Sequence, residues 1–543
     1  MKTNPCRTAT FPSFLDRAGL SFFFLLWMLL PHLVQARPEK QLYYNQDCTD
    51  FFWTRDVPPG QAGEAIDRYV DEIANAGVTV FLCNSNARRT NYRSRVWDAF
   101  WDGYAPDGPD DQPFLSSIPK GEIPAYRKGI GNMLKVHQQG VDYPGRVIQR
   151  CRFRNISPWI SLRMNDCHYN DIPNHPFHGG FWRDNPQLQR KNSPGYFATC
   201  LDYALPEVRE FYLALVQETL DRYDLDGLEL DFMREPYLFS AKEEAPGTVI
   251  LTEWLRQVRQ RVQAAAAKRG HPIRLGVRVP SRPETAKAMG LDAVSWANEG
   301  LVDLLVVTPR WATLEYDLPI AQWRQLLGKA NVTLVGGLEI LYRPVPSGSP
   351  SQVSPELALG AATLVLSEGA DAVYLFNYFP PTFSPSVYQS MLRSMTSLDF
   401  LSKLPRRVGI TYRDITGPGE SYKAPLPAIG QKIVLSMKLG PAPAKGWIYD
   451  LIIRLASPAP DASSTEKPAV PTPENSPSAF VNGVRCDFVN AAATNRVFTE
   501  LTYRIPAQAL QTTQAHELKL VSANEKPMNI QAAEVFLRPA GPQ

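Results

Sequence analysis

The sequence has a small net charge and few cysteines. Its 543 residues carry a formal net charge of only +3, which is too small to indicate a nucleic-acid or polyphosphate partner. Seven cysteines in so long a chain exclude a disulfide scaffold. Because 44% of the residues are hydrophobic and 20% are charged, the composition also excludes a disordered, collagen-like or coiled-coil protein. The chain therefore has enough apolar residues for a large core.

Long hydrophobic runs are scarce, and the one that stands out lies near the first residue. Basic residues precede the apolar run 20–30 (LSFFFLLWMLL), and Val34-Gln35-Ala36 follows it as a small-residue cleavage site. The run is too short to span a bilayer comfortably, so the pattern favours a secretory signal peptide, residues 1–36, over a membrane anchor. We expect cleavage after Ala36 and a secreted or periplasmic protein without an integral membrane span.

Six cysteines would remain after this cleavage, in a compartment that permits disulfides. Cys83 lies inside an apolar strand and is interpreted as a small buried residue. Cys167 and Cys200 flank one long loop and are candidates for a pair, but the spacing leaves the connectivity open.

Apolar strand-like runs alternate with helix-period segments, such as 284–299, between residues 41 and 400. The eight predicted strands are 42–47, 78–84, 156–165, 227–232, 273–280, 302–308, 332–340 and 372–378. Strands rich in Val, Ile and Leu, each followed by a helix, predict parallel pairing with right-handed crossovers. Eight such units predict a (β/α)8 barrel over residues 37–400. A doubly wound sheet is the alternative, but no glycine-rich phosphate turn follows the first strand.

Short alternating strands replace the helices beyond this region and predict a β-sandwich over residues 401–543. Within it, the segment 456–478 is rich in proline and is expected to be a disordered excursion. Sandwiches of this kind accompany glycosidases as sugar-binding modules, but only by analogy. The lack of a clear aromatic platform favours an inert domain instead.

Acidic residues stand near the carboxyl ends of two predicted barrel strands, where active sites of such barrels lie. In 227–232 (GLELDF), the two-residue strand period puts Glu229 and Asp231 on the inward face. Glu339 ends the seventh strand, and the same two-residue period directs its side chain inward. Three acids near one rim repel one another, so we expect Arg163 and Arg278 to pair with them, or one acid to stay protonated.

Carboxylates on the fourth and seventh strands can flank a sugar ring, one protonating the leaving oxygen and the other acting as nucleophile or base. We interpret Glu339 as the nucleophile or base, and Asp231 or Glu229 as the acid. The alternative is an arginine–carboxylate network that only stiffens the barrel.

The run 222–234 (RYDLDGLELDFMR), preceded by 205–209 (LPEVR), resembles the bacterial barrels called glycosyl-hydrolase-like family 10. The run 296–305 (WANEGLVDLL) extends this resemblance, which covers most of residues 41–400. It implies a glycosidase-type barrel with Asp231 at the matching strand-end acid. The chitinase-type pattern D-G-x-D-x-D-x-E is similar, but Met233 stands where that pattern has its proton-donating glutamate.

The loop after the third strand, residues 165–183, carries three histidines beside acidic residues. Their spacing matches no standard metal-ligand pattern, so we predict no metal and no other cofactor. Aromatic side chains can pack against the apolar faces of pyranose rings, so tryptophans on the same rim are also predicted to bind the substrate. The predicted substrate-binding residues are Arg163, Asn165, Asp166, His168, Arg278, Asn377, Trp182 and Trp311.

These features predict an exported glycoside hydrolase that cleaves a poly- or oligosaccharide by a two-carboxylate acid/base mechanism. Two alternatives remain open. One is a catalytically silent carbohydrate-binding barrel whose acids are structural. The other is a metal-assisted hydrolase that uses the 165–183 loop.

Overall fold

A computed structural model describes residues 41–193, 195–442, 446–456, 470–494, 497–510 and 515–540. The predicted signal peptide lies outside these residues, and so does most of the proline-rich segment, residues 457–469. Within the described ranges, no helix combines the length and apolar character that crossing a membrane requires.

Eight parallel strands close into a barrel in the order β1-β10-β7-β6-β5-β4-β3-β2. These strands are β1 (Leu42–Gln46), β2 (Val80–Asn84), β3 (Ser157–Arg163), β4 (Gly227–Asp231), β5 (Arg274–Pro280), β6 (Leu304–Thr308), β7 (Thr333–Glu339) and β10 (Ala372–Phe376). Each strand overlaps one of the eight predicted runs. The predicted (β/α)8 barrel is therefore confirmed.

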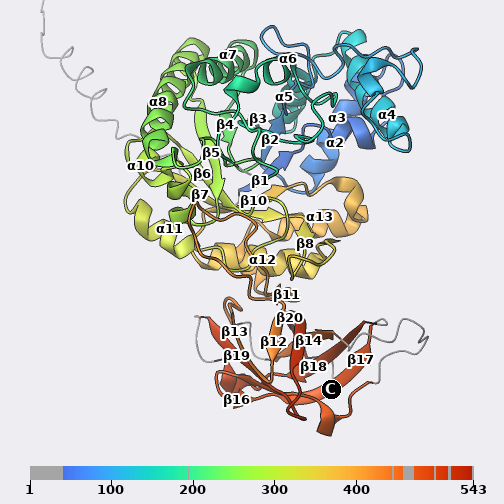
Figure 1. Cartoon of the computed structure of the whole chain (residues 1–543), viewed down its shortest axis with the longest axis vertical. Coiled ribbons are helices and arrows are strands. Elements are labelled where there is room, and N and C mark those ends of the chain that lie inside the picture. The colour runs from blue at the N-terminus through green and yellow to red at the C-terminus, as the bar shows by residue number, and fades with distance from the viewer. Residues whose placement is uncertain are drawn as a thin grey trace, which may run out of the picture. The chain divides into compact units, whose positions relative to one another are not determined.

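Helices surround the strands, as Figure 1 shows. The longer ones are α3 (Ala62–Asn75), α4 (Ile123–Gln138), α5 (Tyr143–Phe153), α7 (Pro206–Arg222), α8 (Glu244–Arg269), α11 (Ile320–Leu327), α12 (Pro355–Ser367) and α13 (Pro385–Ser394). Shorter helices are α2 (Asp50–Thr54), α6 (Gly180–Arg183), α9 (Pro283–Ala288), α10 (Ala293–Asn298) and α14 (Leu398–Leu401), with 3-10 turns at Pro113–Leu115, Pro186–Leu188, Pro380–Thr382, Pro473–Asn475 and Ala507–Ala509. Local chemistry defines the start of α12: the Ser354 hydroxyl accepts a hydrogen bond from the Leu357 N–H, which satisfies a donor that the helix leaves free.

Alternate residues of the barrel strands point inward and form a separate buried cluster, which includes Tyr43, Leu82, Trp159, Val306 and Tyr374. Gly227 on β4 makes room for the Trp159 ring, because a Cβ at this position would clash with it. Bulky side chains therefore fill the barrel from within. The polar residues described below lie toward the carboxyl ends of the strands.

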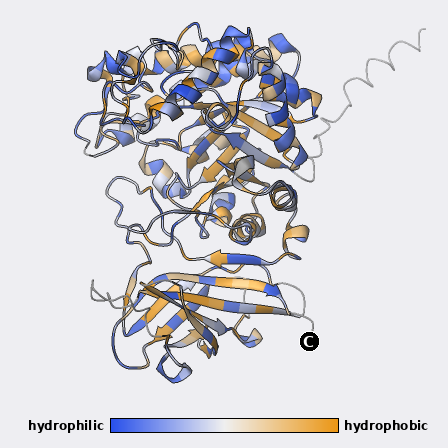
Figure 2. Cartoon of the chain, turned by 90° about the vertical axis from the view of Figure 1, so that its right-hand side faces the viewer, coloured by the Kyte–Doolittle hydropathy of each residue, from blue (hydrophilic) through white to orange (hydrophobic). Residues whose placement is uncertain are grey.

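The C-terminal strands form two antiparallel sheets, which confirms the predicted β-domain in this part of the chain. One sheet has the order β11-β20-β14-β18-β17, with β12 paired to β20, and the other has the order β13-β19-β15-β16. The strands are β11 (Arg406–Gly409), β12 (Ala428–Gly430), β13 (Lys432–Met437), β14 (Trp447–Ala456), β15 (Ser478–Val481), β16 (Val484–Arg485), β17 (Asp487–Ala493), β18 (Phe498–Arg504), β19 (His516–Val521) and β20 (Met528–Pro539). Exposed and buried residues alternate along β13, and hydrophilic and hydrophobic segments can be followed along these strands in Figure 2.

The barrel and the C-terminal strands share several close contacts. Tyr342, in the short hairpin of β8 (Leu341–Tyr342) and β9 (Ser351–Gln352), donates a hydrogen bond to Glu534 Oε1 at 2.9 Å. Gly360 of α12 packs against the backbone of Arg407 in β11 so closely that a Cβ would clash with the carbonyl oxygen. The chain after β11 then returns to the barrel, where Asp414 contacts the loop that follows β6.

The six cysteines of the described residues are buried free thiols. Burial raises the pKa of Cys167, and a hydrogen bond with Cys200 raises it further. The two thiols of the candidate pair are therefore neighbours that carry no covalent bond in the structure.

Candidate active site

The carboxylates of β4 and β7 occupy different depths of the barrel. Asp231, the last residue of β4, lies level with Arg163 of β3 and Arg278 of β5. Glu229 lies two residues earlier, level with Ser161, and therefore one layer deeper. Since inward residues of a barrel stack in layers, Asp231 faces the mouth and Glu229 faces the interior.

Glu229 is tied to three other strands. Its Oε2 atom accepts hydrogen bonds from Asn45 Nδ2 (3.0 Å), Ser161 Oγ (2.6 Å) and Tyr374 Oη (3.0 Å). Burial, together with the neighbouring Asp231 charge, raises the pKa of Glu229 to about 7. These bonds join β1, β3 and β10 to β4 across the barrel, so Glu229 holds the strands in position beneath the mouth.

Asp231 forms a fully buried ion pair with Arg278. Arg278 Nη1 donates to both carboxylate oxygens, at 3.2 and 3.1 Å, and the Met233 N–H donates to Oδ1 at 2.9 Å. The guanidinium of Arg278 lies over the Phe376 ring, 4.0 Å from its centroid. Its Nε and Nη2 atoms have no hydrogen-bond partner among the described residues. These donors can bind a ligand that enters the mouth.

Glu339, the last residue of β7, has one free carboxyl oxygen. Its Oε1 atom accepts a hydrogen bond from the Ile340 N–H at 2.9 Å, whereas Oε2 has no partner among the described residues. Burial raises the pKa of Glu339 to about 8, against the opposing effect of the Arg278 charge. The carboxyl group is therefore protonated at neutral pH and holds a proton that it can donate.

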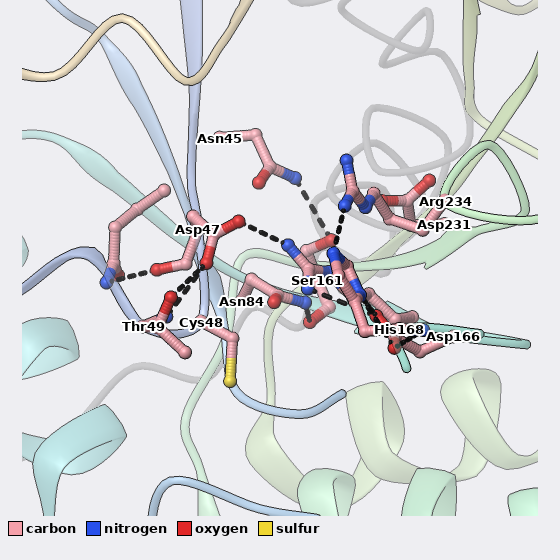
Figure 3. Close-up of polar contacts among 12 residues, drawn as sticks. Asn45, Asp47, Cys48, Thr49, Asn84, Ser161, Asp166, His168, Asp231 and Arg234 are labelled. Atoms are coloured by element: carbon pink, nitrogen blue, oxygen red, sulfur yellow. Dashed lines mark hydrogen bonds and ion pairs between the residues drawn. The ribbon is translucent and has the colours of Figure 1, made fainter. Parts of the chain in front are cut away.

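A chain of charged groups runs from Asp47, which follows β1, to the loop after β4 (Figure 3). Arg163 donates to Asp47 Oδ2 at 2.6 Å and to Asp166 Oδ2 at 3.2 Å. His168 Nδ1 lies 2.8 Å from Asp166 Oδ1, and Arg234 Nη2 lies 2.9 Å from His168 Nε2. Because the guanidinium only donates, Nε2 is the acceptor and the imidazole proton lies on Nδ1. Burial alone would raise the pKa of Asp166, but the surrounding His168 and arginines hold it well below its usual range.

Two of the predicted substrate-binding residues are instead used within the loops. Asn165 donates to the Leu201 carbonyl at 2.9 Å and accepts from the Leu201 N–H at 2.9 Å. Trp182 is 5% exposed, donates to the Thr199 carbonyl at 2.8 Å and packs against the guanidinium of Arg88, 4.1 Å from the ring centroid. Their polar groups are satisfied, so we do not include them among the ligand-binding residues.

Asn377 and Trp311 have groups that remain available. Asn377 follows β10 with a φ of 63°, and its buried Oδ1 has no partner among the described residues. Trp311 follows β6 and is 40% exposed. Both residues can contact a ligand at the carboxyl end of the barrel.

Sequence reasoning did not assign a site role to Glu235, Arg310 or Asp414. Arg310 Nε and Nη2 each donate to Glu235, at 3.1 Å. Asp414 accepts from the backbone N–H groups of Arg310 (3.3 Å), Trp311 (3.0 Å) and Ala312 (2.7 Å). Glu235 and Arg310 each follow a predicted strand, so their positions in the sequence could have indicated a site role. Asp414 comes from the segment after β11, and nothing in the spacing connects it to the barrel.

The remaining loop histidines take part in packing. His175 Nε2 lies 3.1 Å from Tyr126 Oη, and its ring stacks on Tyr169 with centroids 3.6 Å apart. Arg88 Nη1 donates to His178 Nδ1 at 2.8 Å. Burial lowers the pKa of His175 to about 3 and that of His178 to about 4. In the part of the chain that the structure describes, no group of three or more His, Cys, Asp or Glu residues is arranged to hold a metal ion.

Comparisons with known proteins found no matching family model and no matching curated protein. Solved structures that are similar include the PgaB (BpsB) glycoside hydrolase domain from Bordetella bronchiseptica, with a TM-score of 0.41 and 9% identity over 66% of this chain and 99% of that chain. A maltogenic α-amylase, AmyB from Thermotoga neapolitana, has a TM-score of 0.36 and 9% identity over 89% of this chain and 99% of that chain. A putative α-L-fucosidase from Bacteroides thetaiotaomicron has a TM-score of 0.33 and 10% identity over 92% of this chain and 91% of that chain. Glycoside hydrolases are thus among the structural neighbours, but at these values the likeness assigns no substrate and no residue role.

Proposed function

We propose that the protein is a glycoside hydrolase in which Glu339 is the acid and Asp231 is its carboxylate partner. The observation that carries the proposal is the contrast between these two inward groups. Glu339 has a pKa raised to about 8 by burial, whereas Asp231 accepts hydrogen bonds from a guanidinium and a backbone N–H. Glycosidic bond cleavage requires one carboxyl group that donates a proton and a second that acts as nucleophile or base.

In this mechanism the Glu339 carboxyl group donates its proton to the glycosidic oxygen as the bond to the anomeric carbon breaks. Asp231 either attacks that carbon or removes a proton from the attacking water. Arg278 holds Asp231 in place and has free N–H donors for the substrate. The sequence-based interpretation gave Glu339 the role of nucleophile or base, but a carboxyl that is protonated at neutral pH suits the acid role better.

Glu229 has no proposed contact with the sugar. Its Oε2 atom already accepts three hydrogen bonds in the layer below Asp231, so it acts as a positioning residue. Asn377 and Trp311 are the proposed ligand contacts on the rim, together with His168, whose side chain is 31% exposed. A poly- or oligosaccharide is the proposed substrate, because aromatic and amide groups of this kind bind sugar rings and hydroxyls.

A carbohydrate-binding barrel without catalysis is the second candidate, and one observation favours it. Asp231 and Glu339 are only 0% and 1% exposed, so a sugar reaches them only if the surrounding loops leave room. The metal-assisted alternative receives less support, since His175 and His178 are engaged in the hydrogen bonds described above.

The test is reducing-sugar release from a panel of polysaccharides by the purified chain, beside Glu339→Gln and Asp231→Asn variants shown to be folded under the assay conditions. Glu315→Gln is a matched control, because Glu315 is also buried, in the loop after β6, with its pKa raised to about 8 mainly by burial. Removal of one member of the acid pair is expected to lower kcat at least about 100-fold. The control should keep its activity.

The pH dependence gives a second readout of the same assignment. Since Glu339 must donate a proton, kcat/KM is expected to decline as the pH rises through about 8. Equal activity of the wild type and both variants would contradict the acid pair. Binding of a glycan without any product release, with equal affinity in all variants, would support the silent barrel.

A further inference from the structure

Four arginines lie at the carboxyl end of the barrel, three of them buried and Arg310 half-buried, and three of the four form ion pairs. The ion pairs are Arg163 with Asp47 and Asp166, Arg278 with Asp231, and Arg310 with Glu235. Arg234 is the fourth, and it forms no ion pair with any residue that the structure describes, although it is only 4% exposed. A buried guanidinium that makes no direct ion pair is costly, because it has lost water and only carboxylates beyond contact distance, Glu235, Asp47 and Asp166, offset its charge.

The contacts of Arg234 leave part of its hydrogen-bonding capacity unused. Nη2 donates to His168 Nε2 at 2.9 Å, and the guanidinium carbon lies 5.5 Å from the centroid of the Phe376 ring. Nε has no partner among the described residues. Phe376 also packs against Arg278, so Arg234 lies beside the proposed acid pair and not in a remote loop.

The electrostatics of the neighbouring groups agree with this contrast. Burial lowers the pKa of Arg234, whereas Glu235 raises the pKa of Arg310 in spite of its burial. A further buried guanidinium without an ion pair, that of Arg88, interacts electrostatically with Asp166. Glu235, Asp47 and Asp166 offset part of the Arg234 charge, but none of them forms an ion pair with it among the described residues.

We propose that Arg234, oriented by His168, binds a carboxylate carried by the saccharide substrate, as in a uronic acid residue. A guanidinium binds a carboxylate through two parallel hydrogen bonds, and the free N–H groups of Arg234 provide this geometry. His168 is partly exposed, so this side of the mouth is open to solvent. The inference rests on the proposed function, because it names the substrate class of the same site.

The experiment measures binding in the full chain with Glu339→Gln, so that hydrolysis does not interfere. Titration calorimetry compares three uronates, D-glucuronate, D-galacturonate and D-mannuronate, with the neutral sugars D-glucose, D-galactose and D-mannose. At least one uronate is expected to bind at least about tenfold more tightly than its neutral counterpart. Added salt should weaken this preference. If no uronate exceeds its neutral counterpart, the proposal is overturned.

Variants of Arg234 identify the group responsible. Arg234→Gln should abolish the uronate preference, and Arg234→Lys should keep part of it, because an ammonium retains the charge but not the planar pair of donors. Arg343→Gln is the matched control, since Arg343 is half-buried and also forms no ion pair with a described residue; it should leave the preference unchanged. If Arg234→Gln does not fold, an unchanged preference in Arg234→Lys overturns the proposal.

Failure of this subsite and failure of the hydrolase assignment are distinguishable. A uronate preference that depends on Arg234, in a wild-type chain that cleaves no glycan, would leave the subsite standing and remove the catalytic proposal. Cleavage of neutral glycans without any uronate preference would remove the subsite alone.

Discussion

Replacing Glu339 with glutamine should change how folding stability depends on pH. The carboxyl group has a pKa of about 8 in the folded chain and a reference value of 4.5. Between these values the folded chain binds one proton more than the unfolded chain, so stability falls as the pH rises, by about 1.4 kcal/mol per pH unit. The loss reaches about 5 kcal/mol near pH 8 and stays constant at higher pH.

Glutamine at this position keeps the oxygen that accepts from the Ile340 N–H but carries no charge at any pH. We therefore expect Glu339→Gln to match the wild type near pH 4.5 and to exceed it by up to about 5 kcal/mol at pH 8.5. The assay is denaturant unfolding, followed by tryptophan fluorescence at three pH values between these limits. Glu253→Gln is the control, because the Glu253 side chain is 61% exposed on α8 and its replacement should not add a pH-dependent difference.

Parallel loss of stability in the wild type and Glu339→Gln would refute the reasoning. It would mean that Glu339 is already ionised in the folded chain at neutral pH. The group could then not donate the proton that the proposed mechanism assigns to it. The stability experiment therefore tests the acid role without knowledge of the substrate.

Three further predictions concern the residues that hold this site together. Arg278→Gln leaves Asp231 buried without its counter-charge and should cost about 3–5 kcal/mol in denaturant unfolding; the double variant with Asp231→Asn should recover most of this loss. Asp414→Ala leaves three backbone N–H groups of the loop after β6 without their acceptor and should cost about 1–3 kcal/mol, which a reduced unfolding midpoint would reveal. Gly227→Ala forces a methyl group into the Trp159 ring and should cost about 1–3 kcal/mol or more; added Trp159→Phe should relieve part of the clash, and no loss in Gly227→Ala would contradict the packing described here.

The barrel was predictable because runs rich in Val, Ile and Leu alternate with helix-period segments, and because eight such units can be counted along the chain. The ends of individual strands and helices were harder to predict. The run 156–165 was predicted as one strand, but β3 ends at Arg163, since Asn165 turns its amide to the Leu201 backbone. The predicted helix 284–299 is divided into α9 and α10, where Gly290 adopts a φ of 89°. A left-handed residue ends a helix, and this conformation is set by packing as well as by composition.

The site was predictable only in part. Strand parity placed Glu229 and Asp231 on one face, but which residues of β3 and β5 lie level with each follows from the register between strands, which the sequence does not encode locally. Trp182 has the aromatic side chain that a sugar-binding platform needs, yet Arg88 from a different loop covers its ring. Asp414 reaches the barrel from a segment about 100 residues beyond the loop that it binds, and no periodicity reports such a contact.

The different surroundings of Asp231 and Glu339 follow from the residues beside them in the sheet. Asp231 lies between Arg163 and Arg278 in the register of β3, β4 and β5, so a cationic donor is within reach on the neighbouring strand. Glu339 pairs with Phe376 of β10, an apolar neighbour that offers neither charge nor hydrogen bond. Burial then raises the pKa of Glu339, while Arg278 contacts Asp231 directly. The strands beside the two strand-end carboxyl groups thus differ: Asp231 has a guanidinium next to it, whereas Glu339 has the Phe376 ring.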